Sequence, residues 1–166
     1  MHNLILIGLP ASGKTSAGRA LARRLDMPFY DCDEAIEAAQ GQSISAIFSQ
    51  RGEAFFRDAE SRMLEELCRR ERCVIATGGG AVLRPENRLL LRRSGTVFWL
   101  DRPLEDIMST NFQGGRPLLT GGRDALERLA AQRWALYAAC AHHRIPEPLL
   151  EKAVADMENI WRGEYL

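Results

Sequence analysis

The sequence predicts an α/β fold in three layers, with a doubly wound, five-stranded parallel sheet and helices on both faces. Short apolar runs recur at residues 4–7, 29–30, 73–76 and 96–100. Near-continuous apolarity is typical of strands that are covered on both faces. Segments with helical spacing separate these runs, and strands that alternate with helices favour a parallel sheet.

The helices are expected from stripes of apolar residues. Such stripes cover residues 17–25, 55–67 and 150–161, with the spacing of a helix face that packs on a core. Ser43 stands where its hydroxyl would cap a further helix running to about residue 50. Gly52 follows that helix and is expected to end it.

The whole chain, residues 1–166, is expected to form one domain, since this length suits a single core. The fifth strand is expected near residues 144–145, where the apolar pattern is weak. Residues 111–124 contain two glycine pairs around a proline, and a segment of this kind is typical of a hinged lid.

Composition and charge argue against several kinds of partner. Basic and acidic residues number 22 each, so no net field would attract nucleic acid or an anionic membrane. The first apolar run is far shorter than the roughly 20 residues of a membrane span, and no secretory leader is evident. The four cysteines lack metal-site spacing and are interpreted as reduced thiols. We expect a cytoplasmic monomer.

Residues 8–15 read Gly-Leu-Pro-Ala-Ser-Gly-Lys-Thr and fit the phosphate-binding pattern G-x-x-x-x-G-K-[ST]. Backbone N–H groups of such a loop surround phosphate oxygens, and the helix that follows adds a partial positive charge. Lys14 is expected to reach the β- and γ-phosphates, and Thr15 to offer its hydroxyl to Mg²⁺. A strand before the motif and a helix after it disfavour a glycine-rich turn that binds nothing. The expected nucleotide-binding residues of this loop are Ala11, Ser12, Gly13, Lys14, Thr15 and Ser16.

Two carboxylates, those of Asp31 and Asp33, follow the second strand. On extended chain they would face the same way, about 6.5–7 Å apart, at the sheet edge where ligands bind. One would serve the metal, and the other would hold and deprotonate an acceptor hydroxyl. The alternative is a solvated helix cap, because a helical stretch follows Asp33.

Three further features concern the acceptor and the lid. Arg57 follows two phenylalanines, although an exposed pair with Glu60 is the favoured interpretation of this arginine alone. Residues 77–80 read Thr-Gly-Gly-Gly and leave bare backbone for a ligand to approach. Arg116 lies in the expected lid, and Arg133 lies in the helix after it, where a solvated helix face is the simpler interpretation.

Together these motifs resemble the shikimate kinase family. The segments GLPASGKT, DCD, FFR, TGGGAV, RPLL and QRWALY follow that family's order and spacing, from residue 4 to about residue 137. The resemblance implies a P-loop kinase architecture, an acceptor-binding region at about residues 31–62 and a mobile lid at about residues 111–124. It also implies transfer of the γ-phosphoryl group of ATP to the 3-hydroxyl of shikimate, in the biosynthesis of chorismate and aromatic amino acids.

The resemblance implies roles for the acceptor-side residues. Asp33 would hold the shikimate hydroxyls and act as the base. Arg57 and Arg133 would bind the shikimate carboxylate, which suits a guanidinium pair. The backbone N–H of Gly79 would add a further hydrogen bond to that carboxylate.

The resemblance also implies roles on the nucleotide side. Arg116 would bind the nucleotide and meet the transferring phosphoryl group, and it would be catalytic together with Lys14 and Asp33. Thr15 would ligate Mg²⁺, with Asp31 supporting the ion through water.

The chain departs from the family pattern around the nucleotide. Ala11 stands where many members have glycine, and residues 108–111 lack the arginine that covers the adenine ring in many members. The adenine loop is shortened at residues 144–148, and Thr77 stands where some P-loop proteins have a metal-binding aspartate. These departures concern the base and the metal, so nucleotide preference stays open.

Two other functions fit parts of the sequence. One is a kinase for another small hydroxy acid, such as gluconate, on the same fold. The other is a catalytically inactive, nucleotide-binding regulatory module, for which the altered adenine region is the motive. Retention of Lys14, Asp33, Arg57, Arg116 and Arg133 argues against the second.

Overall fold

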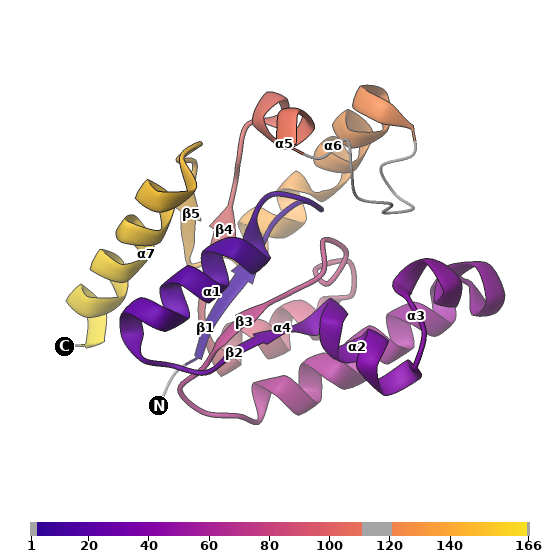
Figure 1. The fold of residues 1–166 in the computed structure, drawn as a ribbon, viewed down its shortest axis with the longest axis horizontal. Helices are drawn as coiled ribbons and strands as arrows, with labels where there is room; N and C mark the ends of the chain where they lie inside the picture. The colour runs from indigo at the N-terminus through magenta and orange to yellow at the C-terminus, as the bar shows by residue number, and fades with distance from the viewer. Residues whose placement is uncertain (1–2, 111–120, 166) are drawn as a thin grey trace.

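A parallel sheet forms the middle layer of the molecule (Figure 1). The computed structural model describes residues 3–110 and 121–165. In the sheet of these residues the strand order is β2-β3-β1-β4-β5, and each neighbouring pair runs parallel. The strands are β1 (Asn3–Ile7), β2 (Phe29–Asp31), β3 (Val74–Ala76), β4 (Gly95–Leu100) and β5 (His143–Ile145). The predicted strands, including the weak fifth one, are confirmed.

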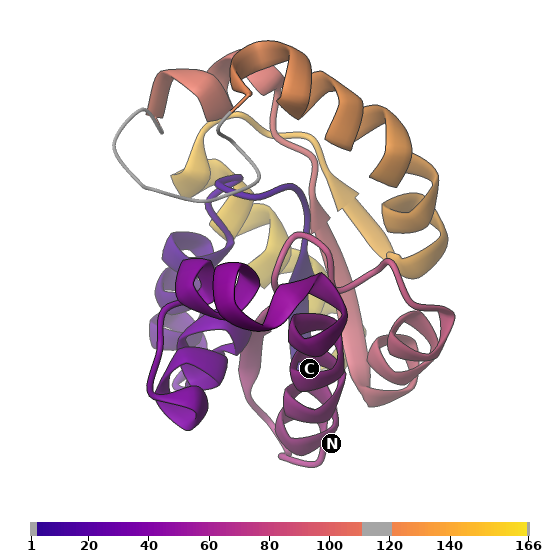
Figure 2. The same cartoon turned by 90° about the vertical axis from the view of Figure 1, so that its right-hand side faces the viewer.

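Helices cover both faces of this sheet, as the view in Figure 2 shows. The helices are α1 (Lys14–Leu25), α2 (Cys32–Gln40), α3 (Ile44–Cys68), α4 (Pro85–Ser94), α5 (Leu104–Thr110), α6 (Gly122–Cys140) and α7 (Leu150–Tyr165). Along β1, Leu4 and Leu6 belong to a core shared with α1 and α7, while Ile5 and Ile7 belong to a core shared with α2, α3, α4 and α6. The alternation arises because successive strand residues point to opposite faces.

Helix α3 consists of two helical segments joined at a break. Ser43 caps its first turn, accepting a hydrogen bond from the N–H of Ala46 at 3.1 Å. Gly52 interrupts it with φ 83° and ψ 170°, a conformation that favours glycine because it has no Cβ. The cap and the break are both as predicted. The break separates residues 44–51 from the segment that carries Arg57.

The expected lid, residues 111–124, lies partly within the described residues. Residues 111–120, which include Arg116, lie outside the described part of the chain. Gly122, Arg123 and Asp124 were assigned to the lid but belong to the first turn of α6.

The four cysteines are free thiols, as predicted. In the described ranges, no helix combines the length and the apolar character that crossing a membrane requires.

Candidate active site

The phosphate-binding loop turns from the end of β1 into α1. Its backbone has positive φ at Gly8 (148°), Ala11 (62°) and Gly13 (93°). Alanine in the left-handed region is strained, so Ala11 holds this conformation at a cost of about 1 kcal/mol. Lys14 is buried, and its Nζ donates to the carbonyl oxygens of Gly8 at 2.9 Å and Leu9 at 2.7 Å. The loop therefore already has the curvature that lets successive N–H groups point inward.

A cavity of about 380 Å³ lies against this loop. We call it the nucleotide cavity. Of the six loop residues expected to bind nucleotide, Ser12 is the exception, because it is buried at 1% exposure and does not line the cavity. The lining residues are Ala11, Gly13, Lys14, Thr15, Ser16, Asp31, Asp33, Thr77, Gly79, Arg102 and Leu150.

Asp31 joins the phosphate loop to the start of α2. Its Oδ2 accepts a hydrogen bond from the Thr15 hydroxyl at 2.5 Å, and its Oδ1 accepts from the N–H groups of Asp33 at 2.9 Å and Glu34 at 3.1 Å. Asp31 is therefore the N-cap of α2. The prediction that Asp31 and Asp33 share an extended strand is wrong, because capping starts the helix at Cys32 and places Asp33 in its first turn.

The Thr15 hydroxyl and the Asp31 carboxylate fit the preferences of Mg²⁺. This ion prefers oxygen ligands and keeps several waters while it binds substrate phosphates. Within residues 3–110 and 121–165, no cluster of three or more His, Cys, Asp or Glu side chains is placed to hold a metal. An ion at this position would take most of its ligands from phosphate and water.

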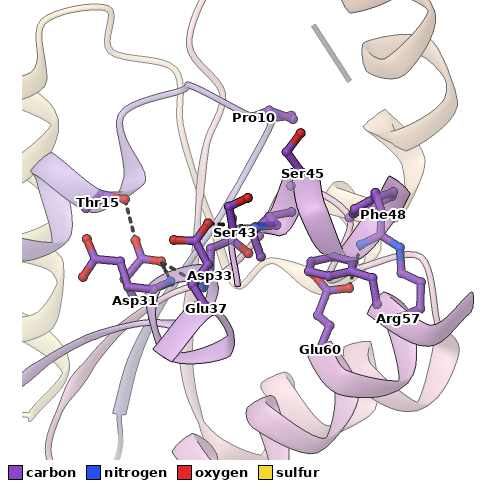
Figure 3. Close-up of a pocket in the computed structure, with 16 residues that line it drawn as sticks. Pro10, Thr15, Asp31, Asp33, Glu37, Ser43, Ser45, Phe48, Arg57 and Glu60 are labelled. Carbon is purple, nitrogen blue, oxygen red and sulfur yellow. Dashed lines mark hydrogen bonds and ion pairs between the residues drawn. The ribbon is translucent and has the colours of Figure 1, made fainter. Parts of the chain in front are cut away.

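A second cavity, also of about 380 Å³, opens beside the first (Figure 3). We call it the acceptor cavity. Thr15, Asp31, Asp33 and Gly79 line both cavities, so the two spaces meet at these residues. The other residues that line the acceptor cavity are Pro10, Glu34, Glu37, Ser43, Ile44, Ser45, Phe48, Phe56, Arg57, Glu60, Gly78 and Gly80.

Arg57 and Glu60 form a buried ion pair on the wall of the acceptor cavity. The Arg57 Nη1 lies 2.7 Å from the Glu60 Oε2, and the two residues are only 6% and 0% exposed. Burial raises the pKa of the Glu60 carboxyl, while the Arg57 guanidinium opposes that shift. The i, i+3 pair exists, but the interpretation of Arg57 as an exposed arginine is wrong.

Each glycine of the loop after β3 faces a group that leaves no room for a Cβ. On Gly78 that atom would lie 2.8 Å from both Asp33 Oδ1 and Glu60 Oε1. On Gly79 it would lie 2.6 Å from the ring of Pro10, and on Gly80 it would collide with the guanidinium of Arg57. The glycines therefore let the loop approach the side chains of the acceptor cavity.

Arg133 projects from α6 toward the same group of charges. It is 3% exposed, so a solvated helix face is the wrong interpretation. Its Nε and Nη1 atoms are buried and have no hydrogen-bond partner in the described residues. Burial raises the pKa of Tyr137 to about 12, and the charges of Arg133 and Arg57 both oppose that shift. Both guanidinium groups thus lie near Tyr137, although only Arg57 lines the acceptor cavity.

Three contributors to this region were missed from the sequence. Glu60 was considered only as a surface partner, although its spacing from Arg57 was noticed. Tyr137 donates a hydrogen bond to the Gly79 carbonyl at 2.6 Å, across 58 residues of sequence. Arg102 lines the nucleotide cavity, and its position just after β4, at the ligand-binding edge of the sheet, was the available signal.

Comparisons with known proteins agree with this geometry. A family model described as shikimate kinase matches residues 10–160. The shikimate kinase of Burkholderia pseudomallei strain 1710b is 50% identical over 143 residues, which cover 84% of this chain and 78% of that protein. The shikimate kinase of Symbiobacterium thermophilum is 47% identical over 150 residues, covering 86% and 85%. The structure of shikimate kinase from Acinetobacter baumannii in complex with shikimate superimposes with a TM-score of 0.92 at 34% identity, covering 100% and 96%.

Proposed function

This chain belongs to the shikimate kinase family, and from that premise we propose how its two cavities divide the substrates. The protein is an ATP-dependent kinase that phosphorylates a hydroxyl group of shikimate. We place ATP in the nucleotide cavity and shikimate in the acceptor cavity. The observation that carries this assignment is that Thr15, Asp31, Asp33 and Gly79 line both spaces. A terminal phosphate and an acceptor hydroxyl would meet there.

Arg57 and Arg133 are proposed to bind the shikimate carboxylate. A buried guanidinium is a strong partner for a carboxylate, because its N–H groups donate two parallel hydrogen bonds. The Nε and Nη1 atoms of Arg133 support this role, since they are buried without a partner and a substrate oxygen would satisfy them. The N–H of Gly79 is proposed as a further donor, in a loop that Tyr137 holds through the Gly79 carbonyl.

Asp33 is proposed to orient the 3-hydroxyl of shikimate and to accept its proton. Its place in the first turn of α2 supports this role, because a helix N-terminus favours a carboxylate in its ionised form. An ionised carboxylate at the junction of the cavities can take the hydroxyl proton as the oxygen attacks the γ-phosphorus. The products are shikimate 3-phosphate and ADP.

The remaining charges are proposed to stabilise the transferring phosphoryl group. Lys14, which now donates to loop carbonyls, would turn to the β- and γ-phosphates. Arg116 would neutralise the same charge from the lid, proposed at residues 111–121 ahead of α6. Thr15 and, through water, Asp31 would hold Mg²⁺, which neutralises charge on the phosphate oxygens when it is bound.

We further propose that residues 1–166 act as one domain, as a monomer in the cytoplasm. Closure of the lid would exclude water, which otherwise competes with shikimate as the phosphoryl acceptor. Size-exclusion chromatography with light scattering tests the monomer, and a mass of two or more chains would contradict it.

The assignment of Asp33 is tested with a coupled assay of ADP release, using shikimate and gluconate as acceptors. The wild-type protein should turn over shikimate and not gluconate. Asp33→Asn should lower kcat by at least about a hundredfold, the lower range of a lost general base, while calorimetry should show unchanged ADP binding. Near-normal turnover by Asp33→Asn would remove this residue from the mechanism.

A further inference from the structure

Arg102 lies between two cavities at the carboxyl edge of the sheet. It follows β4, whose last residue is Leu100, and it lines the nucleotide cavity together with residues of the phosphate loop. It also lines a neighbouring cavity of about 360 Å³, whose walls include Trp99 and Trp134. No role in the phosphoryl transfer described above uses this side chain.

The charge of Arg102 is not neutralised by a carboxylate in the part of the chain that is described. The neighbouring carboxylate of Asp101 is bound by Arg144, at 2.7 Å from Nε and 2.6 Å from Nη2. The Nε of Arg102 is buried and has no hydrogen-bond partner in the described ranges. A buried donor without an acceptor costs free energy, so an anion that accepts a hydrogen bond from this Nε would remove that cost.

The residues that line the nucleotide cavity indicate which anion can reach Arg102. Asp31 and Asp33 lie at the end of the nucleotide cavity that joins the acceptor cavity. Arg102 and Leu150 line the nucleotide cavity but not the acceptor cavity. Leu150 packs beside the phosphate loop, since a Cβ on Gly13 would lie 2.8 Å from its Cδ1. A nucleotide whose terminal phosphate meets Asp33 would therefore extend its α-phosphate toward Arg102.

We propose that Arg102 is a nucleotide-binding residue that donates hydrogen bonds to the α-phosphate. This inference rests on the proposed assignment of ATP to the nucleotide cavity. Lys14 and the proposed lid arginine act on the terminal phosphates, so Arg102 supplies positive charge at the other end of the polyphosphate. Its contribution is to nucleotide affinity, because the α-phosphate changes little during transfer.

The experiment is calorimetric titration of ADP and, separately, of shikimate into the purified full chain. Arg102→Ala should raise the Kd for ADP about tenfold to a hundredfold, the range expected of a hydrogen bond to a charged group. The KM for ATP should rise similarly, with a smaller change in kcat and an unchanged Kd for shikimate. Retained shikimate binding shows that the variant is folded.

Two further variants sharpen the test. Arg162→Ala also removes one positive charge, but from an exposed pair with Glu158 on α7, and its Kd for ADP should stay within about twofold of wild type. Arg102→Lys keeps the charge and should recover part of the ADP affinity.

Two results would overturn the inference. The first is an unchanged Kd for ADP in Arg102→Ala, and the second is an Arg102→Lys variant that binds ADP no better than Arg102→Ala. In either case shikimate phosphorylation by the wild-type protein would still support the proposed function. A wild-type protein that does not phosphorylate shikimate would instead remove the proposed function on which this inference rests.

Discussion

Replacing Gly80 with alanine tests the proposed contribution of Arg57 to acceptor binding. A Cβ on Gly80 would overlap the Arg57 guanidinium, which is the end of a long side chain and can swing aside. The backbone of Gly80 is not among those with positive φ, so alanine fits there without backbone strain. The substitution should therefore displace one charged group and leave the fold intact.

The magnitude follows from the hydrogen bonds that the guanidinium loses. A hydrogen bond to a charged group contributes about 1.5–3 kcal/mol, which corresponds to about a tenfold to 150-fold fall in kcat/KM for shikimate. The carboxylate does not react, so the loss should appear in KM, with kcat nearly constant. Weakening of the Arg57–Glu60 pair should also lower the free energy of unfolding by about 1–3 kcal/mol.

Steady-state kinetics with shikimate as the varied substrate measure the effect, and ADP titration checks that the nucleotide cavity is intact. Gly163→Ala is the matched control, because a Cβ at that position of α7 meets nothing within 4 Å. That variant should keep its KM and gain about 0.5–1 kcal/mol in stability. A Gly80→Ala protein with wild-type KM for shikimate would refute the placement of Arg57 at the acceptor carboxylate.

Three further substitutions have expected outcomes. Ala11→Gly should raise the free energy of unfolding by about 0.5–1 kcal/mol in urea, because it relieves a left-handed alanine; no gain would contradict that strain. Tyr137→Phe should cost about 1–2 kcal/mol, because the Gly79 carbonyl loses its buried donor; an unchanged urea midpoint would argue against this bond. Glu60→Gln tests the raised carboxyl pKa. The folded protein holds that proton more tightly than the unfolded chain, so wild type should lose stability relative to the variant as pH rises above about 4.3. Melting curves at several pH values would show a constant difference if the pKa were normal.

The strands were predictable because burial on both faces produces a continuous run of apolar residues, which is visible within a few positions of sequence. The run from Leu4 to Ile7 needs no knowledge of its neighbours to be recognised as a core strand. Helix α2 was expected only as a helical stretch after Asp33, and helices α4 and α5 were not predicted as elements. Helix α2 depends on the cap at Asp31, and the same aspartate suggested an extended chain when only its spacing from Asp33 was considered.

The candidate site divides in the same way. The phosphate loop is contiguous, so spacing alone was enough to predict that Lys14 and Thr15 lie at one site, and both line the nucleotide cavity. Whether Arg57 is exposed depends on the glycine loop after β3, which packs on it from 23 residues away at Gly80. The contact between Tyr137 and Gly79 depends on how α6 packs against one face of the sheet. No local pattern encodes such distances, so burial of Arg57, Glu60 and Arg133 required the structure.

The glycine break separates the two parts of α3 that line the acceptor cavity. Residues 44–51 contribute Ile44, Ser45 and Phe48 to the lining of the acceptor cavity, while the segment after Gly52 contributes Arg57 and Glu60. The shape of this cavity and its buried charges thus depend on separate pieces of backbone. Substitutions in residues 44–51 can therefore change the shape of this cavity while the buried Arg57–Glu60 pair stays in place.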